Sequence, residues 1–131
     1  MLQFNHVANR IDGRHFDIIV AMFLEKLGFE TLRRLDRAIW MRQPGTNIDL
    51  QLNRSVEQSR DDDKLKSQVS FLSTTPQQDL EELAIWLRER GLNAQVSAYT
   101  TREFYLDVPE AFVDFVVEAM LPELADYPIK E

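Results

Sequence analysis

The stretch Phe23-Leu-Glu-Lys-Leu-Gly-Phe29 returns 63 residues later as Trp86-Leu-Arg-Glu-Arg-Gly-Leu92. Both stretches read as the end of an amphipathic helix, stopped by a C-cap glycine and followed by an apolar residue that opens a strand. Two more matches flank this pair at nearly the same spacing, His6-Val-Ala with Gln68-Val-Ser upstream and Ile48-Asp-Leu with Val113-Asp-Phe downstream. Three matches in one order predict that the chain consists of two copies of one unit.

Each copy is predicted to run strand, helix, strand, strand, strand, which is a βαβββ unit. Apolar residues at every third or fourth position indicate the helices, and alternation between short turns indicates the strands. The first copy is expected to have strands at 2–9, 30–35, 37–42 and 47–52 and a helix at 12–26. The second is expected to have strands at 67–73, 93–98, 102–107 and 111–119 and a helix at 76–90. The predicted fold class is therefore α+β.

At 131 residues the chain is long enough for one ordinary domain with a real core. The repeat divides it into module one at about 1–53, a linker at 54–66, module two at about 67–120 and a tail at 121–131. The linker is polar and contains Asp61-Asp-Asp-Lys64, so we expect it to be solvated.

The bulk composition limits the classes of function. The formal net charge of −7 argues against nucleic-acid binding, which needs a surplus of Lys and Arg. No apolar run has the length of a membrane span, and the first residues lack the pattern of a signal peptide, so a cytoplasmic protein is expected. The absence of cysteine excludes thiolate chemistry and disulfides.

Strand alternation separates an apolar face from a polar one in each copy. In the first copy Leu50 and Leu52 face one way and Asp49 the other, and Asp114 is expected to oppose Phe115 in the same manner in the second. The equivalent polar residues of the two copies are expected to converge on one side of the domain. They are His6, Asp49, Gln68 and Asp114.

These patterns resemble the vicinal oxygen chelate superfamily, which includes glyoxalase I, bleomycin-resistance proteins and extradiol dioxygenases. The resemblance covers about residues 2–119 and rests on four motifs in order. They are Phe4-Asn-His-Val-Ala8, Phe23-Leu-Glu-Lys-Leu-Gly-Phe-Glu30, Ile48-Asp-Leu-Gln51, and Phe104-Tyr-Leu-Asp-Val-Pro109 leading into Val113-Asp-Phe115. It implies two βαβββ modules that form a cup-shaped mixed sheet with the helices outside, and a small-molecule ligand in the cup.

The resemblance also implies a divalent metal, such as Mn, Fe, Ni or Zn, on the family's four ligand positions. By position these become His6, Asp49, Gln68 and Asp114, although the family often has His, Glu, His and Glu there. Such a metal would polarise vicinal oxygens of a substrate in lyase or isomerase chemistry, with Asp114 as the catalytic base. Glutamine in place of the second histidine argues against extradiol dioxygenase activity.

A metal-free protein that sequesters its ligand, of the bleomycin-resistance type, is the alternative. The ligand would then lie against aromatic walls with a cation for an anionic group. The candidates are Trp40, Phe104 and Tyr105 for the walls, and Arg42 and Arg102 for the cation. Single-domain members of the superfamily commonly pair modules between subunits, so the resemblance implies a homodimer.

Overall fold

The computed structural model describes residues 1, 3–56 and 61–125. Module one comprises β1 (His6–Asp12), α1 (Phe16–Ala21), the π-helical turn η1 (Met22–Lys26), β2 (Glu30–Arg34), β3 (Ala38–Arg42) and β4 (Asp49–Ser55). The 3₁₀ turn η2 (Asp61–Lys66) leads to β5 (Gln68–Leu72), α2 (Pro76–Arg88), β6 (Gln95–Ala98), β7 (Glu103–Asp107), β8 (Val116–Met120) and the short turn η3 (Pro122–Ala125). The predicted α+β class with two βαβββ modules is confirmed.

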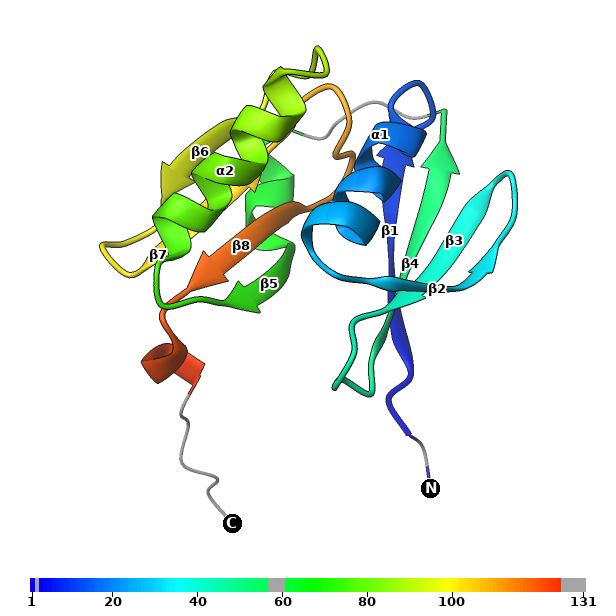
Figure 1. Cartoon of the computed structure of the whole chain (residues 1–131), viewed down its shortest axis with the longest axis horizontal. Helices are drawn as coiled ribbons and strands as arrows, with labels where there is room; N and C mark the ends of the chain where they lie inside the picture. Colours follow the sequence, from blue (N-terminus) through cyan, green and yellow to red (C-terminus); the bar gives the residue numbers. More distant parts are fainter. Residues whose placement is uncertain (2, 57–60, 126–131) are drawn as a thin grey trace.

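Each module forms its own four-stranded mixed sheet (Figure 1). The strand order is β1-β4-β3-β2 in the first sheet and β5-β8-β7-β6 in the second. In both, the first strand of the module pairs in parallel with the fourth, and the other pairs are antiparallel. The two sheets lie next to each other with β1 and β5 as their inner strands, so the junction between the modules is built from two sheet edges.

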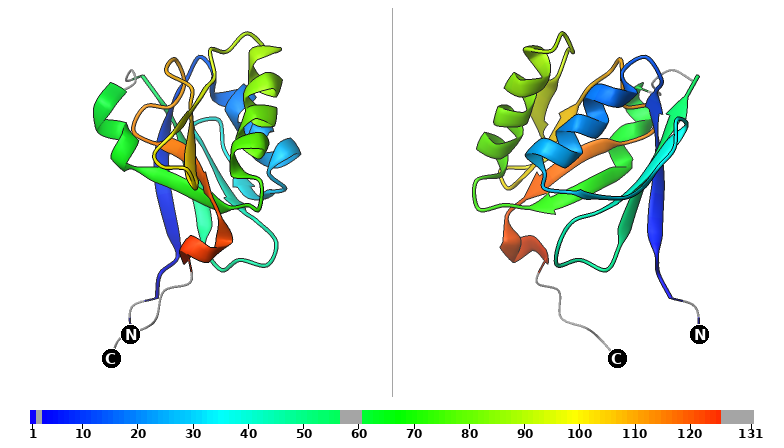
Figure 2. Two further views of the ribbon diagram at one scale, coloured as in Figure 1. Left: turned by 90° about the vertical axis from the view of Figure 1, so that its left-hand side faces the viewer. Right: turned by 45° about the vertical axis from the view of Figure 1, so that its right-hand side comes forward.

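The helices α1 and α2 lie on the same side of the two sheets, as the views of Figure 2 show. One continuous core fills the space beneath them and takes alternate strand residues from both modules. The strand residues of this core include Ile39, Met41, Leu50 and Leu52 from the first sheet and Leu106, Val117 and Ala119 from the second. The predicted C-cap glycines are confirmed, since Gly28 and Gly91 have φ angles of 70° and 87°.

Several element boundaries differ from the prediction, and residues of the other module decide two of them. β1 continues to Asp12, whose N–H donates to Ala111 O of module two at 2.8 Å, so the first helix begins at Phe16. The last strand begins at Val116, because the preceding segment is irregular although it is apolar. Phe112, Val113 and Phe115 of that segment are all fully buried, so the expected alternation with Asp114 is absent.

The linker is not a solvated connection throughout, which corrects the expectation for 54–66. The ammonium group of Lys64 in η2 is buried, donates to Phe112 O at 2.8 Å and lies 2.6 Å from Asp107 Oδ1. Leu65 O accepts a hydrogen bond from Tyr99, and burial raises the pKa of that tyrosine hydroxyl. The turn η2 is therefore anchored to module two, whereas residues 57–60 lie outside the described part.

The modules are joined at one end of β1 by a set of contacts that we call the closed joint. Ile11 and Phe112 form an isolated antiparallel bridge, and Val113 N donates to Arg10 O at 3.2 Å. The backbone N and the Nε of Arg10 each donate to a carboxylate oxygen of Asp114 at 3.1 Å. A short segment of module two thus occupies the edge of β1 as an added strand would.

Acid is expected to weaken the turn that follows β1. The guanidinium of Arg14 donates to both carboxylate oxygens of Asp12, at 3.1 and 2.7 Å, and holds the pKa of that carboxyl below its usual value. Because the folded pKa is lowered, the stabilisation is present above about pH 4 and is lost as the pH falls through the folded pKa. Because the Arg14 side chain is 68% exposed and water screens the pair, Asp12→Asn should cost at most about 1 kcal/mol at pH 6.

Urea unfolding of the natural protein and of Asp12→Asn between pH 6 and pH 2.5 measures this effect. The stability difference between the two should shrink toward the acid end. A difference that stays constant over the whole range would show that the Asp12 charge is not the cause.

Candidate functional site

The first two predicted site residues come together on the face of the sheet opposite α1. His6 and Asp49 begin β1 and β4 and are direct partners in the parallel ladder. Asp49 is buried, and its Oδ1 accepts a 2.6 Å hydrogen bond from Arg42 Nε, which raises the pKa of the arginine. His6 is exposed, and its Nδ1 lies 2.8 Å from Asn5 Oδ1. An arginine therefore already compensates the charge of Asp49.

The other two predicted site residues do not form an equivalent pair. Gln68 begins β5, but its ladder partner is Val116, while Asp114 lies before β8 and is bonded to Arg10. Gln68 Nε2 lies 3.3 Å from the Tyr99 hydroxyl. The strand pairing thus aligns β8 with β4 two residues away from the alignment that the sequence repeat predicts, so Asp114 lies outside the ladder and pairs with Arg10 instead of lying beside Gln68.

The donor atoms at these positions fit a divalent metal poorly. Each of the two carboxylates already has a cationic partner, since Arg42 donates to Asp49 and Arg10 donates to Asp114. Across residues 1, 3–56 and 61–125, no group of three or more His, Asp or Glu side chains could hold a metal ion. We therefore derive no chemical step that passes through a metal.

The predicted aromatic wall is divided between the two sheets. Trp40 lies on β3 two residues from Arg42 and on the same face, with the guanidinium carbon of Arg33 5.7 Å from its ring centroid. Trp40 is half-buried, whereas Arg33 and Arg42 are exposed, so the cluster is cationic and open to solvent. It lies next to the ion pair of Asp49, so one module presents an indole and two arginines on the face opposite its helix.

Phe104 and Tyr105 are adjacent on β7 and therefore point to opposite faces. Phe104 packs against the core beneath α2, so it is not available to a ligand on the other face. Tyr105 packs on Tyr99 with ring centroids 4.6 Å apart. Arg102 is exposed in the turn before β7. Of the two candidates on β7, Tyr105 is the one on the helix-free face.

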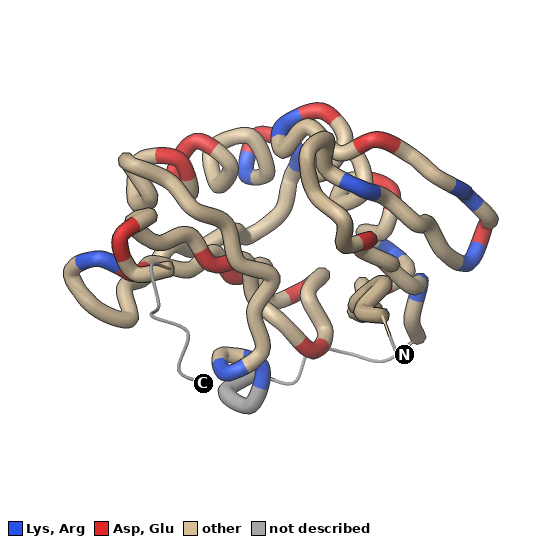
Figure 3. The backbone as a smooth tube through the Cα atoms, turned by 90° about the horizontal axis from the view of Figure 1, so that it is seen from below, with Lys and Arg blue, Asp and Glu red and all other residues tan. Residues whose placement is uncertain are grey.

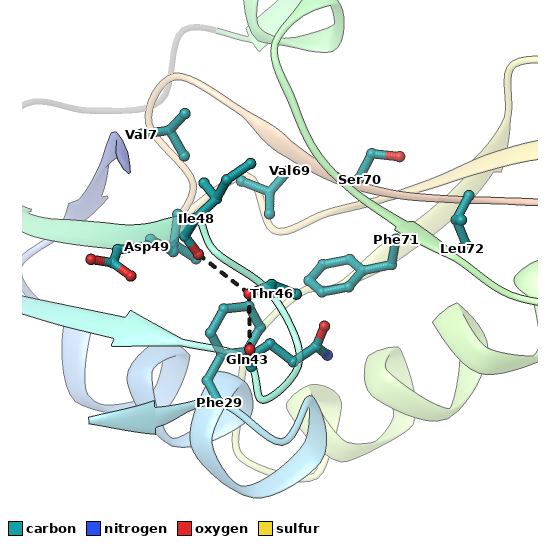
Figure 4. A pocket seen from close by; sticks show the side chains of 11 residues that line it. Val7, Phe29, Gln43, Thr46, Ile48, Asp49, Val69, Ser70, Phe71 and Leu72 are labelled. Carbon is teal, nitrogen blue, oxygen red and sulfur yellow. Dashed lines mark hydrogen bonds between the residues drawn. The ribbon is translucent and has the colours of Figure 1, made fainter. Parts of the chain in front are cut away.

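A cleft opens between the inner edges of the two sheets, at the end away from the closed joint (Figure 4). Its volume is about 490 Å³, within the range typical of small-molecule sites. Mostly apolar side chains line it, including Val7, Ile48, Val69, Phe71 and Phe29, with Gln43, Thr46 and Ser70 as the polar groups. Asp49 also lines it, but its carboxylate points away from the centre of the cleft.

The cleft exists because the second junction between the modules does not close. The ladders align β1 with β5 at an offset of 62 residues and β4 with β8 at an offset of 67. By these offsets Leu72 is the counterpart of Arg10, and Thr46 and Asn47 are the counterparts of Val113 and Asp114. We call this second junction the open joint.

The residues of the open joint lack the contacts of the closed joint. Val113 is fully buried, whereas its counterpart Thr46 is exposed and is held in its own turn, with its N–H and hydroxyl bonded to Gln43 O. Leu72 is 54 % exposed, and neither it nor Asn47 carries the charge that joins Arg10 to Asp114. The apolar walls of the open joint are left facing each other.

Charge does not dominate the surroundings of this cleft. In the view from below, acidic and basic residues are interspersed along the backbone (Figure 3). The one charged side chain that lines the cleft, among the described residues, is Asp49, and Arg42 neutralises it. An uncharged ligand suits such walls better than an ion, because an ion would lose its hydration without gaining a partner.

Sequence reasoning missed the walls of the cleft. Phe29 and Phe71 make an edge-to-face contact with centroids 6.1 Å apart, but each reads from the sequence only as an apolar strand residue. Gln43 and Thr46 read as the ends of a turn. The available signal was the difference between the copies, a charged Arg10 opposite an apolar Leu72 in the aligned first strands.

No family model matches the sequence, and no curated protein matches it. Solved structures do match the fold. Lactoylglutathione lyase from Agrobacterium tumefaciens is 14% identical with a TM-score of 0.57, covering 98% of this chain and 99% of that one. The bleomycin-binding protein of Streptomyces verticillus, solved with copper(II)-bleomycin, is 18% identical with a TM-score of 0.54, covering 92% and 98%. The fosfomycin resistance protein FosX of Listeria monocytogenes is 9% identical with a TM-score of 0.60, covering 92% and 91%.

Proposed function

We propose that this chain, which has the vicinal oxygen chelate fold, binds a small, largely apolar organic molecule in the cleft between its modules, without a metal ion. The fold resemblance predicted from the sequence is confirmed. The observation that carries the proposal is the apolar cleft of about 490 Å³ at the open joint. Solvent-exposed apolar walls of this kind are costly to leave in water, so a ligand that covers them gains free energy.

Two further observations support metal-free binding over metal-assisted conversion. The carboxylates of Asp49 and Asp114 are engaged by arginines, so the base expected at Asp114 has a charge partner of its own. The proteins of known structure with this fold include one solved with bleomycin and one that confers fosfomycin resistance, so binding of small organic molecules is compatible with the fold.

Association into a homodimer remains part of the proposal. No helix of the described ranges is long and apolar enough to cross a membrane. The side chain of Leu32 on β2, which is 49% exposed and does not line the cleft, would be partly covered if two chains associate. The dimer would not change the assignment of the cleft, which belongs to one chain.

A carboxylate placed in the cleft should abolish binding of an apolar probe. Ile48 lines the cleft and is 46% exposed, so Ile48→Asp should fold normally but require a bound apolar molecule to contact an unpaired charge. Desolvating that charge should weaken binding by roughly tenfold or more. Titration of the natural protein and the variant with the uncharged dye Nile red, followed by fluorescence, measures the change.

Ile85→Asp provides the matched control, because Ile85 is 50% exposed on α2 and does not line the cleft. Its affinity for Nile red should stay within about twofold of the natural value, as expected for an exposed site away from the ligand. Binding should also be the same with and without EDTA. Equal losses in both variants, or loss of binding on chelation, would contradict the proposed site.

A further inference from the structure

The edge of β5 that borders the cleft carries backbone groups without a strand partner. β5 is the last strand of its sheet, and its residues 69–72 all line the cleft. Val116 N donates to Ser67 O, and Ser73 N donates to Met120 O, which fixes the phase of the parallel ladder. In such a ladder alternate residues bond the neighbouring strand, so the N–H and C=O of Ser70 and Leu72 are directed away from β8.

The closed joint shows how the equivalent edge is satisfied. There the counterpart of Leu72 is Arg10, whose carbonyl accepts from Val113 N while its N–H donates to Asp114 Oδ1. The residue that reaches this edge, Val113, is apolar and fully buried. The edge of β1 is therefore covered by one donor, the N–H of Val113, and one acceptor, the carboxylate of Asp114, next to the apolar side chain of Val113.

The open joint offers the same backbone pair without such a cover. Thr46, the counterpart of Val113, has turned its own N–H back to Gln43 O. Within residues 1, 3–56 and 61–125, no hydrogen bond of the inter-element backbone network involves Leu72 N or O. The side chains that surround this edge, Val69, Phe71 and Ile48, are apolar.

We infer that the ligand of the cleft is an uncharged, apolar molecule bearing a secondary amide, which pairs its N–H and C=O with the edge of β5 at Leu72. This inference rests on the proposed function and names the class of molecule that the cleft selects. A secondary amide supplies one donor and one acceptor, as the segment at the closed joint does. Its apolar substituents cover Val69 and Phe71, which gives most of the affinity, while the amide gives the selectivity.

A pair of amides that differ in one hydrogen-bond donor tests the inference. N-butylhexanamide and its N-methylated derivative have nearly the same apolar surface, but only the first has an N–H. The secondary amide should displace Nile red from the natural protein at a concentration roughly fivefold to tenfold lower, since the N-methylated compound leaves the Leu72 carbonyl without its donor. Equal displacement by the two compounds would overturn the inference.

Two variants of Leu72 test the protein side of the same pairing. Leu72→Pro removes the N–H that is directed toward the cleft but none of the bonds to β8, and proline is tolerated on an edge strand in this position. Leu72→Ala keeps that N–H and removes the side chain. The secondary amide should bind Leu72→Pro several-fold more weakly than Leu72→Ala. Equal affinities would overturn the inference, and the comparison of the two amides decides it even if the proline variant does not fold.

The outcomes separate this inference from the proposed function. If Nile red does not bind, or if Ile48→Asp leaves its binding unchanged, the proposed function fails. If Nile red binds as proposed but the two amides are equivalent, only the amide class fails. A second copy of the chain is the other possible occupant of the cleft, and sedimentation velocity with and without Nile red tests for it. A dimer that dissociates as the dye binds would show that the second copy fills the cleft and would overturn the inference.

Discussion

Lys64→Met is expected to destabilise the protein by about 3–5 kcal/mol, the cost typical of removing one partner from a buried ion pair. The side chain of Lys64 is 1% exposed and that of Asp107 is 16% exposed, so water does not replace the lost ammonium group. Asp107 Oδ1 is buried and has no hydrogen-bond donor besides this ammonium group among the described residues. Methionine keeps most of the volume of lysine, so the loss reports charge pairing more than packing.

The double variant Lys64→Met with Asp107→Leu separates the two causes. Replacing both partners by apolar side chains removes the orphaned carboxylate, and such replacements are often neutral or stabilising. The double variant should therefore recover most of the stability lost in the single one. Urea unfolding of both variants, followed by tryptophan fluorescence, gives the comparison. A double variant as unstable as the single one would mean that η2 itself, and not the ion pair, requires the lysine.

Phe112→Ala is expected to destabilise the protein by about 3–5 kcal/mol, because it leaves a cavity in a fully buried site. The Phe112 ring is stacked on Phe115 with centroids 4.7 Å apart, and its backbone forms the bridge to Ile11 at the closed joint. The substitution removes the packing that holds the two modules together there. The loss should appear as a lower midpoint of urea unfolding.

Phe4→Ala is the control for this variant, since Phe4 is 68% exposed. A change at such a surface position is expected to stay within about 0.5 kcal/mol. A small effect at Phe112 would show that the modules are not held together by the closed joint. A loss at Phe112 with two separate unfolding transitions would instead show that the modules unfold independently.

The sequence predicted the fold well where local pattern decides it and poorly where the other module decides it. The helix ends at Gly28 and Gly91 and the apolar faces of Leu50 and Leu52 follow from spacing within one element, and both are confirmed. The boundaries at Asp12 and Val116 depend on contacts between modules, which periodicity does not encode. An apolar segment that is buried without strand pairing, such as residues 112–115, has the same composition as a strand.

The candidate site was less predictable than the fold. Asp49 was placed correctly beside His6, but the sequence gives no sign that Arg42, seven residues earlier, would neutralise it. The prediction for Asp114 rests on the match of Ile48-Asp-Leu with Val113-Asp-Phe, and the register of the β-ladder differs from that match by two residues. The cleft depends on two turns and two sheet edges that meet only in the folded chain, so no single motif indicates it.

The contrast between the two joints has a consequence for how such a protein changes after duplication. In an assembly of two identical units around a two-fold axis every contact occurs twice, so an ancestor with identical halves would have had two equal junctions. In this chain the two junctions differ, because Arg10 and Asp114 form an ion pair at the closed joint while their counterparts Leu72 and Asn47 carry no charge at the open joint. The closed joint therefore joins the two modules, and the open joint leaves the cleft between them. Under the proposed function, substitutions at the open joint are expected to change which ligand binds while the contacts of the closed joint stay intact.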